Sequence, residues 1–203
     1  MEKLVTGVMR DPASLPNPDT ESKIDFTKNF FIDNFLADDE FKALQDAIMF
    51  NDQFPLTAIK NVSTSRIWNT EQTEKEKKQF WSYNFVHLVY VNDAPQSEIF
   101  VPLYNAFLPK FLDLGIIKSL TRIKVNVYPN TETVREHADH TDRPYFIKAG
   151  LFGLNTCDGY TTIGEKKLPS VANRMYFFDA SKPHRSSTTT DTELRYNINF
   201  NFL

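Results

Sequence analysis

The C-terminal half of the chain consists of short segments in which apolar and polar residues alternate. Turn-forming residues separate these segments, and the pattern continues from position 119 to position 202. Alternation with a period of two, interrupted by turn signals, is typical of β-strands. We therefore predict a β-sandwich or barrel, with strands at 119–128, 133–140, 146–154, 159–164, 171–178 and 193–202.

Helical spacing marks the N-terminal half instead. The stretch that starts at Phe30 ends in the acidic cluster 38–40, which suits the first turn of a helix because acidic side chains complement its positive end. Phe41, Leu44 and Ile48 then recur at helical spacing. A strand feeding an amphipathic helix fits this pattern.

A second helix is predicted over 95–114. Its apolar residues recur four apart, and Gly115 is a plausible C-terminal stop, while Pro102 and Pro109 favour a kink. The recurring residues are Ile99, Leu103, Phe107 and Phe111.

Three further stretches complete the N-terminal half. Residues 11–23 are rich in proline and polar residues and predict an extended lead-in. The charged run 73–79 predicts a short helix or turn, and the aromatic and β-branched run 80–91 predicts a strand.

Helices followed by strands predict an α+β fold in which the N-terminal helices buttress one face of a β-sandwich. At 203 residues the chain suits one domain. We expect residues 24–118 to form the supporting region and residues 119–203 the β core, with the chemistry inside the mouth of the sandwich.

Charge and cysteine content narrow the function classes. The 23 Lys and Arg against 26 Asp and Glu give a net charge of −3, which provides no global basic field for nucleic acid. The single cysteine, Cys157, rules out an internal disulfide and favours a reducing cytoplasm. Neither a signal peptide nor a membrane-spanning apolar run is recognisable, so we expect a cytoplasmic protein without a membrane partner.

Residues 135–142 contain two overlapping His-x-Asp pairs, His137 with Asp139 and His140 with Asp142. On a strand, residues two apart point to the same side, so either pair could grip one cation. His184 lies 44 positions after His140 and offers a third ligand. Two imidazoles and one carboxylate make the facial triad of non-haem Fe(II) oxygenases, which leaves positions open for cosubstrate and oxygen.

The last predicted strand has two chemically opposite faces. Arg195 and three asparagines occupy one face, and apolar residues occupy the other. The polar face could be solvated, as at a simple edge, or it could face inward. Facing inward, Arg195 could offer its planar fork to a carboxylate in a sheltered cleft, and Asn126 and Tyr128 from strand 119–128 could line the same pocket.

These residues resemble the 2-oxoglutarate- and Fe(II)-dependent oxygenase superfamily, in which His-x-Asp, a later His and then Arg occur in this order. The chain is most similar to short prolyl-hydroxylase-like oxygenases of marine bacteriophages and bacteria. The resemblance is close over about 120–203 and looser before it. The matching segments are Val125-Asn-Val-Tyr-Pro, His140-Thr-Asp, Leu154-Asn-Thr-Cys-Asp-Gly-Tyr-Thr, Val171-Ala-Asn-Arg, Arg195-Tyr-Asn-Ile-Asn-Phe and, in the N-terminal half, Ile32-Asp-Asn-Phe-Leu.

The resemblance implies a double-stranded β-helix, also called a jelly-roll or cupin-like fold. It implies a dioxygenase that uses Fe(II), 2-oxoglutarate and O2 to hydroxylate a peptide or small molecule, releasing succinate and CO2. The metal ligands would be His140, Asp142 and His184, because the family places the adjacent pair at a strand end and Arg143-Pro144 suggests such an end. Arg195 would hold 2-oxoglutarate, with Tyr128 and Asn126 beside it.

Several alternatives stay open at this point. His137 with Asp139 could be the ligand pair, since the distance from Tyr128 to His137 along the chain is also similar to that in prolyl hydroxylases. The same iron could support another oxidative outcome, such as demethylation or desaturation. A cupin-like protein that binds a small acid without catalysis, or a structural module, would use the same fold. The prime substrate and the oligomeric state have no signal in the sequence.

Overall fold

The computed structural model of the chain describes residues 22–60 and 83–203. The predicted segment 73–79, the first residues of the predicted strand 80–91 and nearly all of the predicted lead-in 11–23 lie outside these ranges. The elements in chain order are β1 (Phe30–Ile32), α1 (Asp38–Ile48), β2 (Thr57–Lys60), β3 (Tyr83–Val91), β4 (Ala94–Pro95), α2 (Phe100–Asp113), β5 (Leu120–Pro129), β6 (Lys148–Gly153), β7 (Cys157–Ile163), β8 (Lys166–Ser170), β9 (Met175–Asp179), β10 (His184–Ser186) and β11 (Leu194–Phe202).

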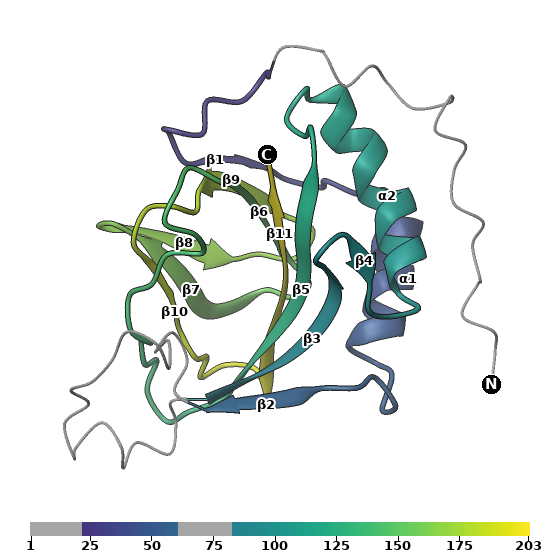
Figure 1. Cartoon of the computed structure of the whole chain (residues 1–203). Coiled ribbons are helices and arrows are strands. Elements are labelled where there is room, and N and C mark those ends of the chain that lie inside the picture. The colour runs from purple at the N-terminus through teal and green to yellow at the C-terminus, as the bar shows by residue number, and fades with distance from the viewer. Residues whose placement is uncertain (1–21, 61–82) are drawn as a thin grey trace.

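The described strands form two antiparallel sheets (Figure 1). The major sheet has eight strands in the order β1-β9-β6-β11-β5-β3-β2, with β4 paired to β3. The minor sheet has the order β10-β7-β8. Mostly antiparallel strands with few helices are consistent with a jelly-roll or cupin-like fold.

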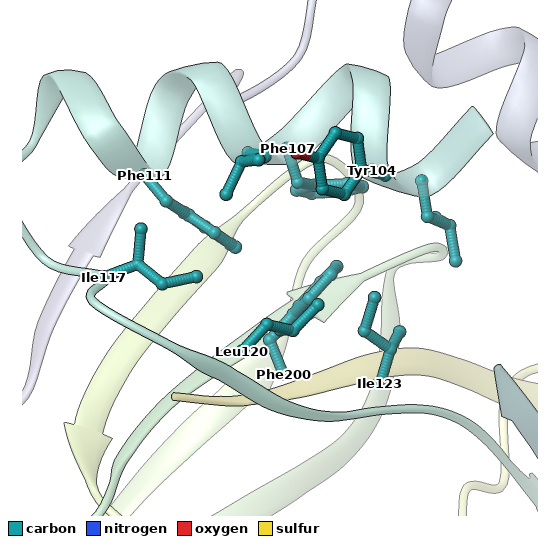
Figure 2. A pocket seen from close by; sticks show the side chains of 9 residues that line it. Tyr104, Phe107, Phe111, Ile117, Leu120, Ile123 and Phe200 are labelled. Carbon is teal, nitrogen blue, oxygen red and sulfur yellow. The ribbon is translucent and has the colours of Figure 1, made fainter. Parts of the chain in front are cut away.

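The two helices cover the face of the major sheet that lies away from the minor sheet (Figure 1). Phe107 of α2 packs against Phe200 of β11 with ring centroids 4.6 Å apart, and Phe111 packs against Phe202 at 5.3 Å. Figure 2 shows Phe107 and Phe111 pointing from the helix toward the sheet, around a small pocket lined by apolar and aromatic side chains. The expected buttressing of one sheet face by N-terminal helices is therefore confirmed.

Strand β11 lies in the middle of the major sheet, between β6 and β5, and both of its faces are buried. Its apolar face meets the helices, whereas the polar face turns toward the minor sheet. Arg195 is only 1% exposed, and its Nη2 donates to Thr161 Oγ1 of β7 at 2.8 Å. The inward orientation of the polar face is confirmed, and a solvated edge is wrong.

Helix boundaries differ from the prediction for local reasons. Helix α2 begins at Phe100 rather than at residue 95, because Pro95 pairs with β3 as part of β4. Pro109 lies inside the helix. Helix α1 begins directly at the acidic cluster, and Glu40 Oε2 accepts a hydrogen bond of 3.2 Å from the Ala37 backbone N–H, which satisfies one of the free donors at the helix start.

Two predictions in the β region are wrong. Residues 133–140 form no continuous strand and contribute only isolated bridges, Glu136 to Ser187 and His140 to His184. The predicted strand 171–178 is displaced to β9, and β8 precedes it as an additional strand with Pro169 inside. Strand β8 lies at an edge of the minor sheet, where a proline is tolerated because one side of the strand needs no N–H donor.

Candidate metal centre

The segment between β5 and β6 carries both His-x-Asp pairs. It runs along β10, the outer strand of the minor sheet on this side, so that His140 lies opposite His184. The backbones of His140 and His184 exchange two hydrogen bonds of 2.9 Å each. This pairing sets the two imidazoles side by side, with ring centroids 4.3 Å apart.

Asp142 completes a cluster with the two histidines. Its backbone N–H donates to Ala180 O at 2.9 Å, which fixes the chain just beyond His140. One ligand atom from each of His140, Asp142 and His184 lies within 4.8 Å of the others. Within residues 22–60 and 83–203, no other group of three His, Cys, Asp or Glu residues has this geometry.

The protonation states suit metal binding. His184 Nδ1 lies 2.9 Å from Lys182 O, and because a carbonyl only accepts, Nδ1 carries the proton and Nε2 keeps its lone pair. Burial, followed by the neighbouring His184, lowers the pKa of His140 to about 4, so its imidazole is neutral at physiological pH.

The Asp142 carboxylate is held by two donors. Arg122 Nη2 donates to Oδ1 at 2.7 Å, and Asn201 Nδ2 donates to Oδ2 at 2.8 Å. Arg122 Nε also donates to Asn201 Oδ1 at 2.9 Å, which closes a ring of three side chains. Burial alone would raise the pKa of Asp142, but Arg122, His184 and Asn201 hold it below its ordinary value. Each carboxylate oxygen keeps one lone pair for a cation.

The competing pair does not converge in the same way. His137 is buried, and its Nδ1 lies 3.0 Å from Ser186 Oγ, while its ring packs beside Tyr128 at 5.6 Å. The Asp139 side chain is 54% exposed and accepts a 3.0 Å hydrogen bond from Arg185. Because this stretch is not a regular strand, residues two apart need not share a side, and Asp139 turns outward.

A cavity between the two sheets opens onto the histidines and Asp142, and most of the side chains that line it are polar. The lining residues are Lys124, Asn126, Tyr128, His140, Asp142, Leu151, Thr161, Phe178, His184, Ser186 and Asn199. Asn126 and Tyr128 therefore line the same cavity as His140, Asp142 and His184.

Arg195 lies further along the same face of β11, opposite Tyr128 in the β5–β11 register. Its Nη1 donates to Ser187 O at 3.0 Å, and its guanidinium carbon lies 5.1 Å from the Tyr128 ring centroid. Among the described residues no carboxylate pairs with Arg195, and Nε has no partner. A buried guanidinium without an anion is costly, so the site favours an anionic ligand.

Gly159 makes room for this arginine. A Cβ at position 159 would lie 2.7 Å from Arg195 Cδ and 2.7 Å from Thr188 O. Any larger residue would therefore displace the Arg195 side chain or the backbone beside it.

The sequence analysis did not assign Arg122, Asn201 or Lys124 to the site. Arg122 and Lys124 share the face of β5 that carries Asn126 and Tyr128, and Asn201 shares the face of β11 that carries Arg195. The alternation of polar and apolar residues along β5 and β11 already places these three residues on the faces that carry the predicted site residues. Assigning every residue of each face to the site would have identified them.

Comparison with known proteins identifies the fold. No family model matches the sequence, and no curated protein is found as a relative. Among solved structures, a Pseudomonas putida prolyl-4-hydroxylase matches with a TM-score of 0.57 and 13% identity, covering 86% of this chain and 91% of that one. A Trichoplax adhaerens prolyl hydroxylase, solved with a hypoxia inducible factor peptide fragment, matches with a TM-score of 0.55 and 18% identity, covering 86% and 83%.

A third structure is a non-haem alpha-ketoglutarate-dependent epimerase from nogalamycin biosynthesis. It matches with a TM-score of 0.59 and 14% identity, covering 88% of this chain and 78% of that one. The chain therefore has the fold found in prolyl hydroxylases and other 2-oxoglutarate- and Fe(II)-dependent oxygenases. In the described part of the chain, neither helix has the length and apolar character to span a membrane.

Proposed function

We propose that the protein is an Fe(II)- and 2-oxoglutarate-dependent dioxygenase with a double-stranded β-helix core. The observation that carries this proposal is the convergence of His140, Asp142 and His184 at a cavity whose surrounding face also holds the buried Arg195. Two imidazoles and a carboxylate suit Fe(II), and they leave coordination positions for a chelating cosubstrate and oxygen.

Different residues would bind the iron and the cosubstrate. His140, Asp142 and His184 would hold the iron, and Arg195 would bind the distal carboxylate of 2-oxoglutarate through a charge-assisted fork. Tyr128 packs beside that guanidinium, and Asn126 is held by donating to Asn197 Oδ1 at 3.0 Å, so both would line the space that 2-oxoglutarate occupies. Bound iron supplies the oxidising chemistry that converts 2-oxoglutarate and O2 to succinate and CO2 while a substrate C–H bond is hydroxylated.

A buried cation that lacks an anion would equally suit a protein that binds a small acid without catalysis. Succinate release separates the two functions. Anaerobically reconstituted Fe(II) protein is expected to release succinate from 2-oxoglutarate after O2 is admitted, and more of it when a peptide or metabolite library contains the prime substrate. Binding of 2-oxoglutarate without any succinate would favour the binding protein.

The ring formed by Arg122, Asn201 and Asp142 gives a prediction about metal affinity. Asn201→Leu is expected to weaken Fe(II) binding by about 10-fold to 100-fold, because groups that orient metal ligands typically have effects of that size. Anaerobic titration with Fe(II) measures the change. Asn197→Leu is the matched control on the same face of β11, and it should leave Fe(II) affinity within about twofold. Equal effects of the two substitutions would contradict the orienting role of Asn201.

A further inference from the structure

Lys124 is a cation in the cavity that the proposed reaction does not use. It lies on β5, lines the cavity with His140 and Asp142, and stands directly opposite Asn199 in the β5–β11 register. Among residues 22–60 and 83–203, its ammonium group has no hydrogen bond and no ion pair.

Asn199 adds an unused polar group at the same place. Asn199 is 8% exposed and lines the cavity, and in the described part of the chain neither its Nδ2 donor nor its buried Oδ1 acceptor has a hydrogen-bond partner. The Nδ2 group is the one that can donate to an anion. Residues directly opposite each other on one face of an antiparallel pair have adjacent side chains. One ammonium and one amide therefore lie together at the metal end of the cavity.

The acids nearby are already engaged. Asp142 is the one acid among the described residues that line the cavity, and its two oxygens already accept from Arg122 and Asn201. Glu136 and Asp139 accept from Arg185 instead, at 2.8 and 3.0 Å. The described residues that line the cavity therefore offer no second carboxylate, and Asp142, whose charge favours the Lys124 ammonium, forms no ion pair with it.

The charges at this end of the cavity would stay positive in the loaded enzyme. A divalent cation would add two positive charges to those of Arg122 and Lys124, whereas Asp142 and the keto acid end of 2-oxoglutarate each bring one negative charge. The distal carboxylate of 2-oxoglutarate would be neutralised by Arg195. A positive excess in a sheltered cavity favours a further anion.

We propose that Lys124, with Asn199 beside it, binds a carboxylate at the metal end of the cavity, and that this carboxylate belongs to the prime substrate. A carboxylate has two acceptor oxygens, which match one ammonium and one amide NH2. The inference rests on the proposed function and adds a substrate class, namely molecules that present a carboxylate close to the carbon to be oxidised. The carboxylate at the keto acid end of 2-oxoglutarate is the other group that Lys124 and Asn199 could bind.

Fluorine NMR of fluoroacetate, with fluoroacetamide as the neutral counterpart, tests the inference without turnover. Protein loaded with Mn(II) and saturated with 2-oxoglutarate is titrated with each probe, and the metal broadens the fluorine signal of a probe that binds close by. Fluoroacetate is expected to bind the wild type at least about tenfold more tightly than Lys124→Met, since a charge-assisted hydrogen bond is lost. Lys124→Arg should retain the probe, and fluoroacetamide should not distinguish the variants.

Calorimetric titration of 2-oxoglutarate into the same Mn(II)-loaded variants separates the sources of the carboxylate. Loss of fluoroacetate binding with unchanged 2-oxoglutarate affinity assigns Lys124 to the prime substrate. A tenfold loss of 2-oxoglutarate affinity alone assigns it to the keto acid end and overturns the substrate class. Unchanged binding of both ligands in a folded Lys124→Met variant overturns the inference while the proposed function stands.

If the wild type binds neither Mn(II) nor 2-oxoglutarate, the proposed function fails. The comparison of wild type and Lys124→Met with fluoroacetate is then made on metal-free protein by saturation-transfer NMR. There too, equal binding by the two proteins would overturn the role of Lys124.

Discussion

His140→Ala, Asp142→Ala and His184→Ala are each expected to abolish stoichiometric Fe(II) binding, weakening it by more than about 100-fold. A site with three protein ligands that loses one keeps too few donors, so the effect should exceed the roughly 10-fold to 100-fold cost of disturbing a group behind a ligand. Anaerobic titration with Fe(II), monitored by calorimetry, measures this directly. Succinate formation without prime substrate should disappear in the same three variants.

The other His-x-Asp pair, His137 with Asp139, provides the control for these three substitutions. Asp139→Ala removes a carboxylate that is half exposed and paired with Arg185, so Fe(II) binding should stay within about twofold of wild type. His137→Ala should also keep its metal, although loss of its packing against Tyr128 is expected to alter cosubstrate binding. Loss of metal in the His137 and Asp139 variants, with retention in the His140 and Asp142 variants, would reverse the ligand assignment.

Arg195→Ala is expected to raise the dissociation constant of 2-oxoglutarate by on the order of 100-fold, because truncating one partner of a buried charge pair costs several kcal/mol. Fe(II) affinity should change little, since Arg195 lies several residues from Asn201 along β11 and contacts no proposed ligand. Arg195→Lys should recover part of the affinity, because lysine restores the charge but not the planar fork. Calorimetry of 2-oxoglutarate into the metal-loaded protein measures all three effects.

Arg185→Ala is the control for Arg195→Ala, because it also removes an arginine, but one that lies outside the cavity. Arg185 pairs with Glu136 and Asp139 on the outer side of β10 and is 27% exposed. Arg185→Ala should therefore leave 2-oxoglutarate affinity within about threefold of wild type. Equal losses in the Arg185 and Arg195 variants would point to general destabilisation, and an unchanged affinity in Arg195→Ala would remove Arg195 from the site.

The sequence by itself determined the elements with strong periodicity. Alternation over nine or ten residues located β5 and β11 to within a residue or two, and recurring apolar residues located both helices. The weak elements were missed or misplaced. Strand β8 is short and carries two lysines and a proline, so it has little apolar signal. Residues 133–140 alternate like a strand but follow only the edge of the minor sheet through isolated bridges.

The candidate residues were likewise named from the sequence, because a His-x-Asp pair, a later histidine and an arginine occur in the order of the oxygenase superfamily that the sequence resembles. Tertiary structure decided which of them meet. Periodicity states that the two faces of β11 differ, but only the packing of α2 on one face and β7 on the other directs Arg195 inward. Spacing of two residues could not choose between His137 with Asp139 and His140 with Asp142. That choice depends on the backbone pairing of His140 with His184 and on the ring of Arg122 and Asn201 around Asp142, contacts between segments 20 to 59 residues apart.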